Sequence, residues 1–401
     1  MTVLHSGVGI TAGETYLPAR PDEVWWGLLP NAASRPVLTV PSGQAIRIDT
    51  ISHEGLLADQ GGDPRTFFGA AGIPADALLD DVLALAGSGR RHQPDVAGPH
   101  VVTGPVAVRG ARPGDVLEVE VLDLVRRAPY GAISNRHGRG ALPGEMPIAP
   151  PGLPAGAAVP PVCLVAHTRG ESGVLPVGDG RQIRFPLRPF LGIMGVAAAT
   201  TDPVHSVPPG PHGGNLDIRH LGVGARLYLP VQVPDALFYA GDPHFAQGDG
   251  EVALTAFEAP LRALLRLTVR SDETVRRTAR ALSAPWAQTD ALHIVAGLDP
   301  DLGAAMRAAT RNAVAFLGER FALPPHVALA YLSAAGDFAV SQVVDQVVGV
   351  HCCIRRDDLR GLDEANGLDE ANGLGGPDGP DGPDGPDGPD GLGGPDGDIG
   401  G

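Results

Sequence analysis

Three acidic residues and one histidine, Asp242, His244, Asp249 and Glu251, fall within ten residues of one another. In an extended chain, side chains two positions apart lie on the same face, so Asp242 aligns with His244 and Asp249 aligns with Glu251. A turn over residues 245–248 would place His244 opposite Asp249 and Asp242 opposite Glu251. The spacing therefore predicts a hairpin in which all four side chains converge.

Carboxylates that converge in this way repel one another unless they are protonated or share a cation. One imidazole with several carboxylates suits zinc or a similar divalent ion, and calcium is an option where oxygen ligands dominate. We expect the ligands to come from Asp217, Asp242, His244 and Glu251. An exposed acidic hairpin with glycine-rich turns is the alternative interpretation of the same pattern.

Four ordered segments carry a longer pattern: TGPVAVRGARPGDVLEVEVLDL (103–124), GGNLD (213–217), LYLPVQVPDALFYAGDPHFAQGDGEV (227–252) and LSAAGDFAVSQVVD (332–345). Together with Glu258, they resemble the acetamidase/formamidase family of amide hydrolases, and the likeness extends over roughly residues 16–356. The resemblance implies hydrolysis of a small linear amide to a carboxylate and ammonia, and it implies a homo-oligomer. The segment DTISHEG (49–55) departs from the acidic pattern of many members.

Catalytic roles are expected for Glu251 and Asp249. Glu251 ends the acidic cluster beside Gly250, whose missing side chain leaves room for a substrate. A carboxylate next to an activated water can take its proton and later deliver it to the departing amine. A metal in the cluster would activate the water and polarise the carbonyl.

Substrate binding is expected for Asn215, Gln247 and His137. Asn215 and Gln247 carry uncharged donors and acceptors that complement a carboxamide. His137 lies in a loop rich in glycine and proline, residues 128–161, and such long loops often close over a site. His53 and His100 lie at strand ends, where a lone histidine is more typical of a hydrogen-bonded surface position.

The basic and sulfur-containing residues exclude several other mechanisms. All 30 basic residues are arginine, so Schiff-base chemistry, a Walker-type phosphate loop and the lysine-dependent amidase mechanisms are unavailable. No Gly-x-Ser-x-Gly pentapeptide occurs. The three cysteines form neither a disulfide framework nor a zinc pattern, and no flanking charge lowers a thiol pKa. Water is therefore the expected nucleophile.

Two other functions fit the same residues. A Gly-Asp-x-His sequence followed by a glutamate on short strands imitates a cupin-like metalloenzyme, such as an oxygenase or isomerase. An iron site of that kind normally takes two histidines and one carboxylate, whereas the cluster offers only His244. A metal- or ligand-binding protein without turnover is the other alternative.

Charge and composition point to a cytoplasmic protein. Residues 361–401 contain eleven acids, two GLDEAN repeats and a run of five consecutive Gly-Pro-Asp triplets, so we expect a disordered tail. Without that tail, 35 acids face 30 bases, which leaves no basic surface for nucleic acid or an anionic membrane. Neither a signal peptide nor an apolar stretch long enough for a membrane span is expected.

The expected fold class is α+β. A strand-rich N-terminal and central region, in the form of a β-sandwich or barrel, precedes a mixed helical and stranded C-terminal region. The expected divisions are 1–210, 211–360 and the tail. Strands are expected at 103–108, 116–124, 227–233 and 340–350, a hairpin at 37–48, and helices starting near 271, 299 and 325.

Overall fold

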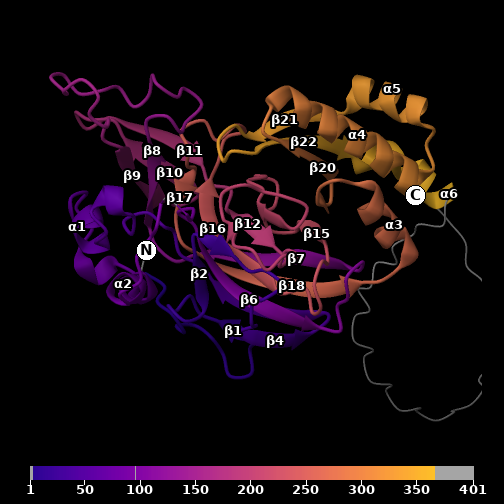
Figure 1. The fold of residues 1–401 in the computed structure, drawn as a ribbon, viewed down its shortest axis with the longest axis horizontal. Helices are drawn as coiled ribbons and strands as arrows, with labels where there is room; N and C mark the ends of the chain where they lie inside the picture. The colour runs from indigo at the N-terminus through magenta and orange to yellow at the C-terminus, as the bar shows by residue number, and fades with distance from the viewer. Residues whose placement is uncertain (1–2, 95, 366–401) are drawn as a thin grey trace, which may run out of the picture.

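Two large β-sheets dominate the computed structural model, which describes residues 3–94 and 96–365 (Figure 1). The first is a nine-stranded sheet whose strands lie in a non-sequential order. From one edge to the other it contains β1 (Tyr16–Leu17), β5 (Gln44–Asp49), β18 (Leu261–Arg270), β7 (Val116–Arg126), β15 (Arg226–Pro230), β19 (Trp286–Gln288), β20 (Leu292–Asp299), β22 (Val348–Arg355) and β21 (Asp337–Gln342).

The second sheet has eleven strands and carries the central segment of the chain. Its main path runs through β11 (Gln182–Pro186), β10 (Ser172–Pro176), β9 (Val162–Arg169), β8 (Tyr130–Asn135), β17 (Phe257–Glu258), β16 (Phe238–Ala246), β12 (Phe190–Gly195) and β14 (Gly213–Asn215). Strand β6 (Val101–Arg109) joins this path at β16 and also pairs with β2 (Val24–Trp26) and β4 (Leu38–Pro41). Strands β3 (Leu28–Leu29) and β13 (Val204–His205) form a separate small sheet.

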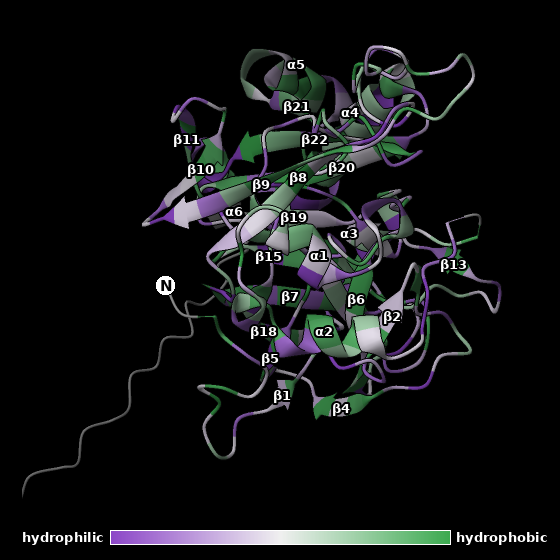
Figure 2. Cartoon of the chain, turned by 90° about the vertical axis from the view of Figure 1, so that its left-hand side faces the viewer, coloured by the Kyte–Doolittle hydropathy of each residue, from purple (hydrophilic) through white to green (hydrophobic). Residues whose placement is uncertain are grey.

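The largest hydrophobic cluster lies between the two sheets. It contains Ile46 and Val119 from the nine-stranded sheet and Val106 and Phe238 from the eleven-stranded sheet, all buried. The alternation of apolar residues along each strand sends every second side chain into this layer. Figure 2 shows the apolar colour on strands such as β4 and β22. The sheets therefore face each other over a shared core.

The helices lie at two places around the sheets (Figure 1). They are α1 (Pro64–Gly69), α2 (Asp80–Gly87), α3 (Glu273–Ala281), α4 (Leu302–Phe321), α5 (Pro325–Ala335) and α6 (Arg360–Ala365), together with three short 3-10 turns, Ala58–Gln60, Ala75–Ala77 and Arg356–Leu359. Helices α3 to α6 lie near the side of the nine-stranded sheet that is formed by β20, β22 and β21, and α4 packs on β20 and β22. Among the described residues, no helix is long and apolar enough to cross a membrane.

A buried charge network anchors the N-terminal segment to the nine-stranded sheet. The guanidinium of Arg127 lies 2.8 Å from Asp81 and 3.3 Å from Asp49, and all three side chains are buried. Arg262 on β18 binds the same Asp49 at 2.5 Å. Each buried charge has an opposite partner, which offsets its desolvation. Asp49 ends β5, so the network fixes the start of the segment that leads to His53.

The strand-rich α+β class predicted from the sequence is confirmed. The hairpin predicted over residues 37–48 is wrong: β4 runs parallel to β6, and β5 pairs with β18 and β1. The turn residues between β4 and β5 are present, but each strand gains more burial in a different sheet. Residues 340–350 form parts of two strands, β21 and β22, which pair with each other.

The helix starts agree with the sequence to within a few residues. Asp272 caps α3, Asp301 caps α4, and α5 begins at Pro325. The nine-stranded sheet contains strands from before and after residue 210. The domain boundary expected at that residue stays a prediction. Residues 361–365 of the expected tail belong to α6, and the rest of that tail lies outside the described residues.

Close approach between α4 and β20 depends on Gly297. A β-carbon at this position would lie 2.5 Å from the Ala305 oxygen and 2.6 Å from the Ala309 α-carbon. Gly297→Ala should therefore push α4 away from the sheet and lower the free energy of unfolding by about 1–3 kcal/mol or more. Gly318→Ala, within α4, is the control. A β-carbon at this position would lie 3.6 Å from its nearest neighbour, the Leu323 oxygen, so this change should leave stability unchanged or raise it. Denaturant titration of both variants measures the contrast; equal midpoints would contradict it.

Candidate functional site

A cavity of about 700 Å³ opens beside strand β16 and gathers side chains that are far apart in the sequence. His53 and His100 come from the N-terminal third, Arg136 comes from the loop after β8, and Asp345 comes from the turn between β21 and β22. The other ionisable lining residues are Asp59, His92, Arg139, His205, Asp217, Asp242, Glu251 and Glu258. Strands of the eleven-stranded sheet and loops that leave both sheets therefore contribute to one site.

Strand β16 supplies the centre of the site. Asp242 and His244 are two positions apart on this strand, and both are buried. β16 pairs with β12 on one side, where Phe190 lies opposite His244, and with β17 on the other, where Glu258 lies opposite His244. The register of β17 thus brings Glu258 next to a histidine 14 positions earlier in the chain.

Gly192 on β12 leaves the space that the cluster occupies. A β-carbon there would lie 2.6 Å from the Asp242 carboxylate, 2.9 Å from the His244 ring and closer still to the Asp217 carboxylate. The position is therefore reserved for the side chains of other residues. Any larger residue at position 192 would displace these three side chains.

His244 is held in one orientation by its neighbours. Its Nε2 lies 2.9 Å from Glu258 and 3.0 Å from Asp242. Its Nδ1 lies 3.0 Å from Gln247 Oε1. Because the Gln247 NH2 group donates to the backbone oxygens of Asp217 and Ser341, its oxygen faces the ring and accepts the Nδ1 proton. Nε2 then points into the carboxylates, free for a proton or a cation.

Two further histidines face Asp242 from the opposite side. His53 Nδ1 lies 3.9 Å and His100 Nε2 lies 4.0 Å from the same Asp242 oxygen. The two rings pack edge to face with centroids 5.4 Å apart. Ser206 holds His100 through a 3.1 Å hydrogen bond to Nδ1. Asp242 therefore lies between His244 on one side and two histidines on the other.

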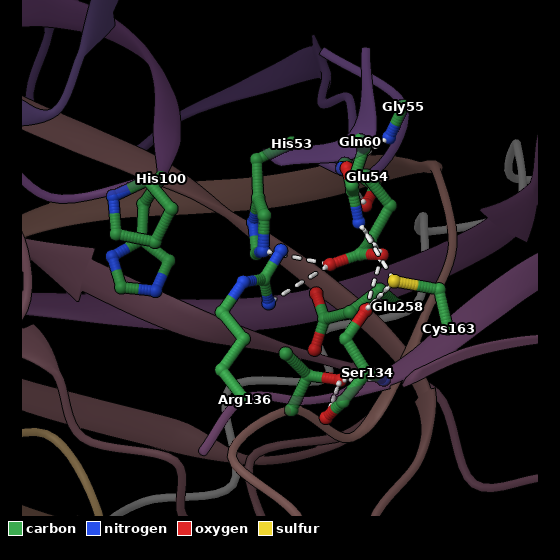
Figure 3. A network of polar contacts seen from close by, with 12 residues as sticks. His53, Glu54, Gly55, Gln60, His100, Ser134, Arg136, Cys163 and Glu258 are labelled. Atoms are coloured by element: carbon green, nitrogen blue, oxygen red, sulfur yellow. Dashed lines mark hydrogen bonds and ion pairs between the residues drawn. The ribbon is translucent and has the colours of Figure 1, made fainter. Parts of the chain in front are cut away.

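A second layer of contacts supports His53 (Figure 3). Glu54 lies 3.3 Å from His53 Nε2 and accepts hydrogen bonds from Ser134 and Gln60. Arg136 approaches the same carboxylate at 3.9 Å. Burial opposes ionisation of Glu54, but the hydrogen bond and charge of His53 outweigh it, so its pKa falls below the usual range. Glu54 thus stays ionised and orients His53.

Burial and crowding shift the pKa values of the central acids in opposite directions. Burial raises the pKa of Asp217 to about 7 and that of Glu258 to about 6, and repulsion from Asp242 adds to both shifts. Burial also opposes ionisation of Asp242, but the attraction of His244 and His100 outweighs it and lowers the pKa. For Glu251, burial and the charge of Asp217 raise the pKa well above its usual value.

The imidazoles respond to the same charges. Burial disfavours protonation of His244, but Glu258 and Asp242 outweigh it and raise its pKa well above the usual value. His100 keeps the effect of burial, which lowers its pKa to about 4. Ionised Asp242 and protonated His244 therefore form the charged centre, with raised carboxyl pKa values around it.

Strained backbone is concentrated at this cavity. Of eleven non-glycine residues with positive φ in the described part of the chain, six line the cavity: Asp217, Asp242, Glu251, Leu254, Asp345 and Gln346. Such conformations cost of order 1–3 kcal/mol each and persist where the surrounding structure imposes them. Asp217, Asp242 and Glu251 are among the six. Backbone strain at these residues therefore accompanies the orientation of their carboxylates into the cavity.

The donor set fits a divalent cation. Three overlapping groups each bring one ligand atom per residue within 4.8 Å: Asp242 with His244 and Glu258, Asp217 with His244 and Glu251, and His53 with His100 and Asp242. Buried oxygens of Asp217, Asp242, Glu251 and Glu258 have no hydrogen-bond partner. Carboxylate oxygen with imidazole nitrogen is the chemistry that divalent ions of intermediate hardness select.

The structure brings together Asp217, Asp242, His244 and Glu251, but by a route that differs from the predicted hairpin. That hairpin is wrong, because β16 pairs with β12, β6 and β17 and not with residues 249–251. Asp249 lies outside the cavity lining and binds Arg219 at 2.6 Å. Glu251 reaches the cluster through a turn of its own, with φ of 45°.

The three residues predicted to bind substrate lie in different surroundings. Asn215 lines the cavity; its NH2 group donates to Asp345 at 2.8 Å, and its oxygen has no partner. Gln247 uses both ends of its amide on the protein and orients His244. His137 contacts the Pro147 oxygen at 3.3 Å, while its neighbours Arg136, Gly138 and Arg139 line the cavity.

Sequence reasoning underrated His53 and His100, named Glu258 only through the family pattern, and missed Asp345. His53 is 2% exposed and His100 is 6% exposed, so neither is a surface histidine. Their flanking sequences gave no spacing signal, because each partner lies in a distant strand. A run of polar residues at 49–54 that turns out to be buried was the one available hint.

Comparisons with known proteins agree with this arrangement. Residues 193–348 match the sequence model of the Acetamidase/Formamidase family. The acetamidase of Mycolicibacterium smegmatis is 30% identical over 204 residues, and the formamidase of Methylophilus methylotrophus is 28% identical over 197 residues. Each match covers 39% of this chain and 50% or 48% of the relative. The chain thus matches about half the length of these curated relatives.

Solved structures extend the likeness beyond the matched segment. The crystal structure of an acetamidase from Bacillus halodurans superposes with a TM-score of 0.66 at 25% identity, covering 86% of this chain and 99% of that one. An acetamidase from Yersinia enterocolitica shares the fold with a TM-score of 0.67 at 22% identity, covering 88% of this chain and 96% of that one. Over residues 193–348 in sequence, and over most of its length in fold, the chain is therefore similar to members of the acetamidase/formamidase family.

Proposed function

We propose that this chain hydrolyses a small linear amide of the formamide or acetamide class to a carboxylate and ammonia. The observation that carries the proposal is the buried group of Asp242, His244 and Glu258 at the wall of the cavity. A similar chain is named acetamidase and another formamidase, which supports the reaction class. A cytoplasmic homo-oligomer is part of the same proposal, from the cysteine usage and the family resemblance.

We infer that the site holds a divalent metal ion, with zinc favoured and calcium an alternative. Its ligands would come from Asp217, Asp242, His244 and Glu258, with His53 and His100 adjacent. When bound, such an ion supplies polarisation of the amide carbonyl and a lowered pKa of water. The buried carboxylate oxygens that have no hydrogen-bond partner support this assignment.

Glu251 is the proposed proton carrier. Burial and the charge of Asp217 raise its pKa well above the usual value, so the carboxyl group holds a proton more tightly than an exposed glutamate does and can act as a general acid or base. Its Oε2 is buried without a partner at the cavity wall. Glu251 would take a proton from the attacking water and return it to the departing nitrogen. Asp249, held by Arg219, is left out of this role.

Asn215 is the proposed binding group for the amide nitrogen. Its oxygen is buried, has no partner and belongs to the cavity lining. Because its own NH2 group donates to Asp345, this oxygen is fixed as an acceptor for the substrate NH2. A site that hydrogen-bonds the substrate in this way disfavours esters of the same shape, which would leave the Asn215 oxygen unpaired.

A second candidate function has one observation in its favour. His53, His100 and Asp242 form the two-histidine, one-carboxylate combination that binds iron in oxygenases, and this was absent from the sequence cluster. Ammonia release without oxygen separates the two functions. The amidase remains the better supported, since the family relatives are amide hydrolases by name.

Ammonia release is the direct test of the proposed function. Purified protein with measured metal content is incubated under anaerobic conditions with formamide, acetamide, urea and longer aliphatic amides. We expect turnover of short amides, loss of it after chelation and recovery with zinc. Asp242→Asn should abolish both tight metal binding and turnover. Metal-free protein with full activity would refute the metal assignment, and silence towards every amide would refute the amidase assignment.

Two neighbouring acids separate proton transfer from local charge. Glu251→Gln should keep the fold and the metal but lower kcat by roughly 10²- to 10⁴-fold, because the proton carrier is lost. Asp249→Asn, the matched control, should change kcat by less than about tenfold because it breaks only a partly exposed ion pair. Metal content and kcat are measured on the same preparations. A Glu251→Gln protein without metal would make Glu251 a ligand instead.

The raised carboxyl pKa values predict how the chelator-treated protein responds to pH. Asp217 and Glu258 bind protons more tightly in the folded state than in the unfolded chain, so their contribution to stability is complete at low pH. That contribution is lost as pH rises from about 4, near the unfolded-state pKa values, to about 7, near the raised folded-state values, at a cost on the order of a few kcal/mol. Metal-loaded protein should show a much smaller change. Unfolding midpoints of both forms across this range decide; parallel curves would contradict the prediction.

A further inference from the structure

A second group of potential ligands lies outside the cavity lining, on strand β22. His351 and Cys353 are two positions apart on this strand, so their side chains leave it on the same face. His220, from the loop after β14, meets them there. One ligand atom from each of these three residues lies within 4.8 Å of the others. Cys352, between them, points to the other face and packs under the C-terminal helices.

His351 is oriented towards a ligand that the protein itself does not supply. The ring is fully buried, and its Nδ1 forms a 2.8 Å hydrogen bond with Ser341 Oγ. Its Nε2 has no partner, although a buried polar atom without one costs about 1–3 kcal/mol. Because the hydroxyl group can accept the Nδ1 proton, Nε2 is left with its lone pair. The His220 ring lies edge to face with it, at a centroid distance of 5.4 Å.

We propose that His220, His351 and Cys353 form a second metal site, for a thiophilic divalent ion such as zinc. Two imidazoles and one thiolate select zinc over magnesium or calcium, which take oxygen ligands. Zinc bonds of about 2.0–2.1 Å to nitrogen and about 2.3 Å to sulfur require ligand atoms roughly 3.3–3.8 Å apart. The present separations, within 4.8 Å, are closed by rotations of the side chains. Water takes the fourth position.

The electrostatic surroundings agree with that ligand set. Burial lowers the pKa of His351 to about 4 and also lowers that of His220, so both rings are neutral at neutral pH. Burial raises the pKa of Cys353 to about 11, so its thiol releases a proton when the ion binds. Asp249 and its ion-pair partner Arg219 act on all three residues with opposite signs, so their charges largely cancel at this site.

The proposed ion would fasten the loop that carries Asp217 to the edge of the nine-stranded sheet. His220 is three residues after Asp217, and His351 lies on β22. Ser341 links the two sites: its hydroxyl group contacts His351, and its backbone oxygen accepts a 3.1 Å hydrogen bond from Gln247, which orients His244. The proposed ion would therefore be connected to His244 through Ser341 and Gln247.

Cobalt(II) is the probe that distinguishes this site from the carboxylate cluster. A cysteine ligand gives Co²⁺ a thiolate-to-metal charge-transfer absorption, whereas the ligand groups at Asp242 and His244 contain no sulfur. Full-length protein, chelated and kept reduced, is titrated with Co²⁺. We expect the absorption in the wild type and in two matched controls, Cys352→Ser and Cys163→Ser. It should disappear in Cys353→Ser.

His220→Ala provides a second variant at a partly exposed position, where the fold is under least threat. Mutating a residue that only supports a metal ligand typically weakens metal affinity by about 10- to 100-fold. Removing the ligand itself should weaken Co²⁺ affinity by about 100-fold or more. Circular dichroism confirms that each variant is folded. A wild type without the charge-transfer absorption, or a folded Cys353→Ser protein that retains it, overturns the proposal. An unchanged affinity in His220→Ala would remove His220 from the site and overturn it as stated.

Discussion

The rest of this structure depends on one constraint: several buried carboxyl groups are crowded around His244. His244 can neutralise only part of the charge of Asp242, Glu258, Asp217 and Glu251, and all of them are buried. The acids that are left over hold protons more tightly, as their raised pKa values show. Burying these carboxyl groups costs stability through desolvation and mutual repulsion. A bound cation would offset that cost, and carboxyl groups with raised pKa values can transfer protons. Both properties fit the proposed hydrolysis.

The scaffold meets this constraint through backbone pairing. The register between β16 and β17 sets Glu258 beside His244, and the missing side chain of Gly192 leaves room for Asp217, Asp242 and His244. Gln247 fixes the His244 ring, and left-handed backbone at Asp217 and Asp242 aims their carboxylates inward. Each of these features orients a buried charged or ionisable side chain. Changing any of them should reorient that side chain, and a buried charge without its partner is costly.

Local signals in the sequence predicted local structure and failed where partners are distant. Asp242 and His244 were found because a strand places alternate residues together, and α5 was found from a proline at its first turn. The predicted pairing of residues 37–48 failed because β4 and β5 join different sheets. His53, His100 and Asp345 carried no spacing signal, since only the tertiary fold brings them to Asp242. Family resemblance supplied Glu258, which no local pattern would have given.

The wide spread of the site along the chain has a consequence for its biogenesis. Strand β5 pairs with β18, which follows it by more than 200 residues. The cavity lining includes Asp345, which lies near the end of the described chain. During synthesis from the N-terminus, β5 can pair with β1 at once, but its other edge stays open until β18 has been made. Such edges invite pairing with other chains, and non-local contacts form slowly. Chaperone supply and growth temperature should therefore govern the yield of active enzyme more than its final stability does.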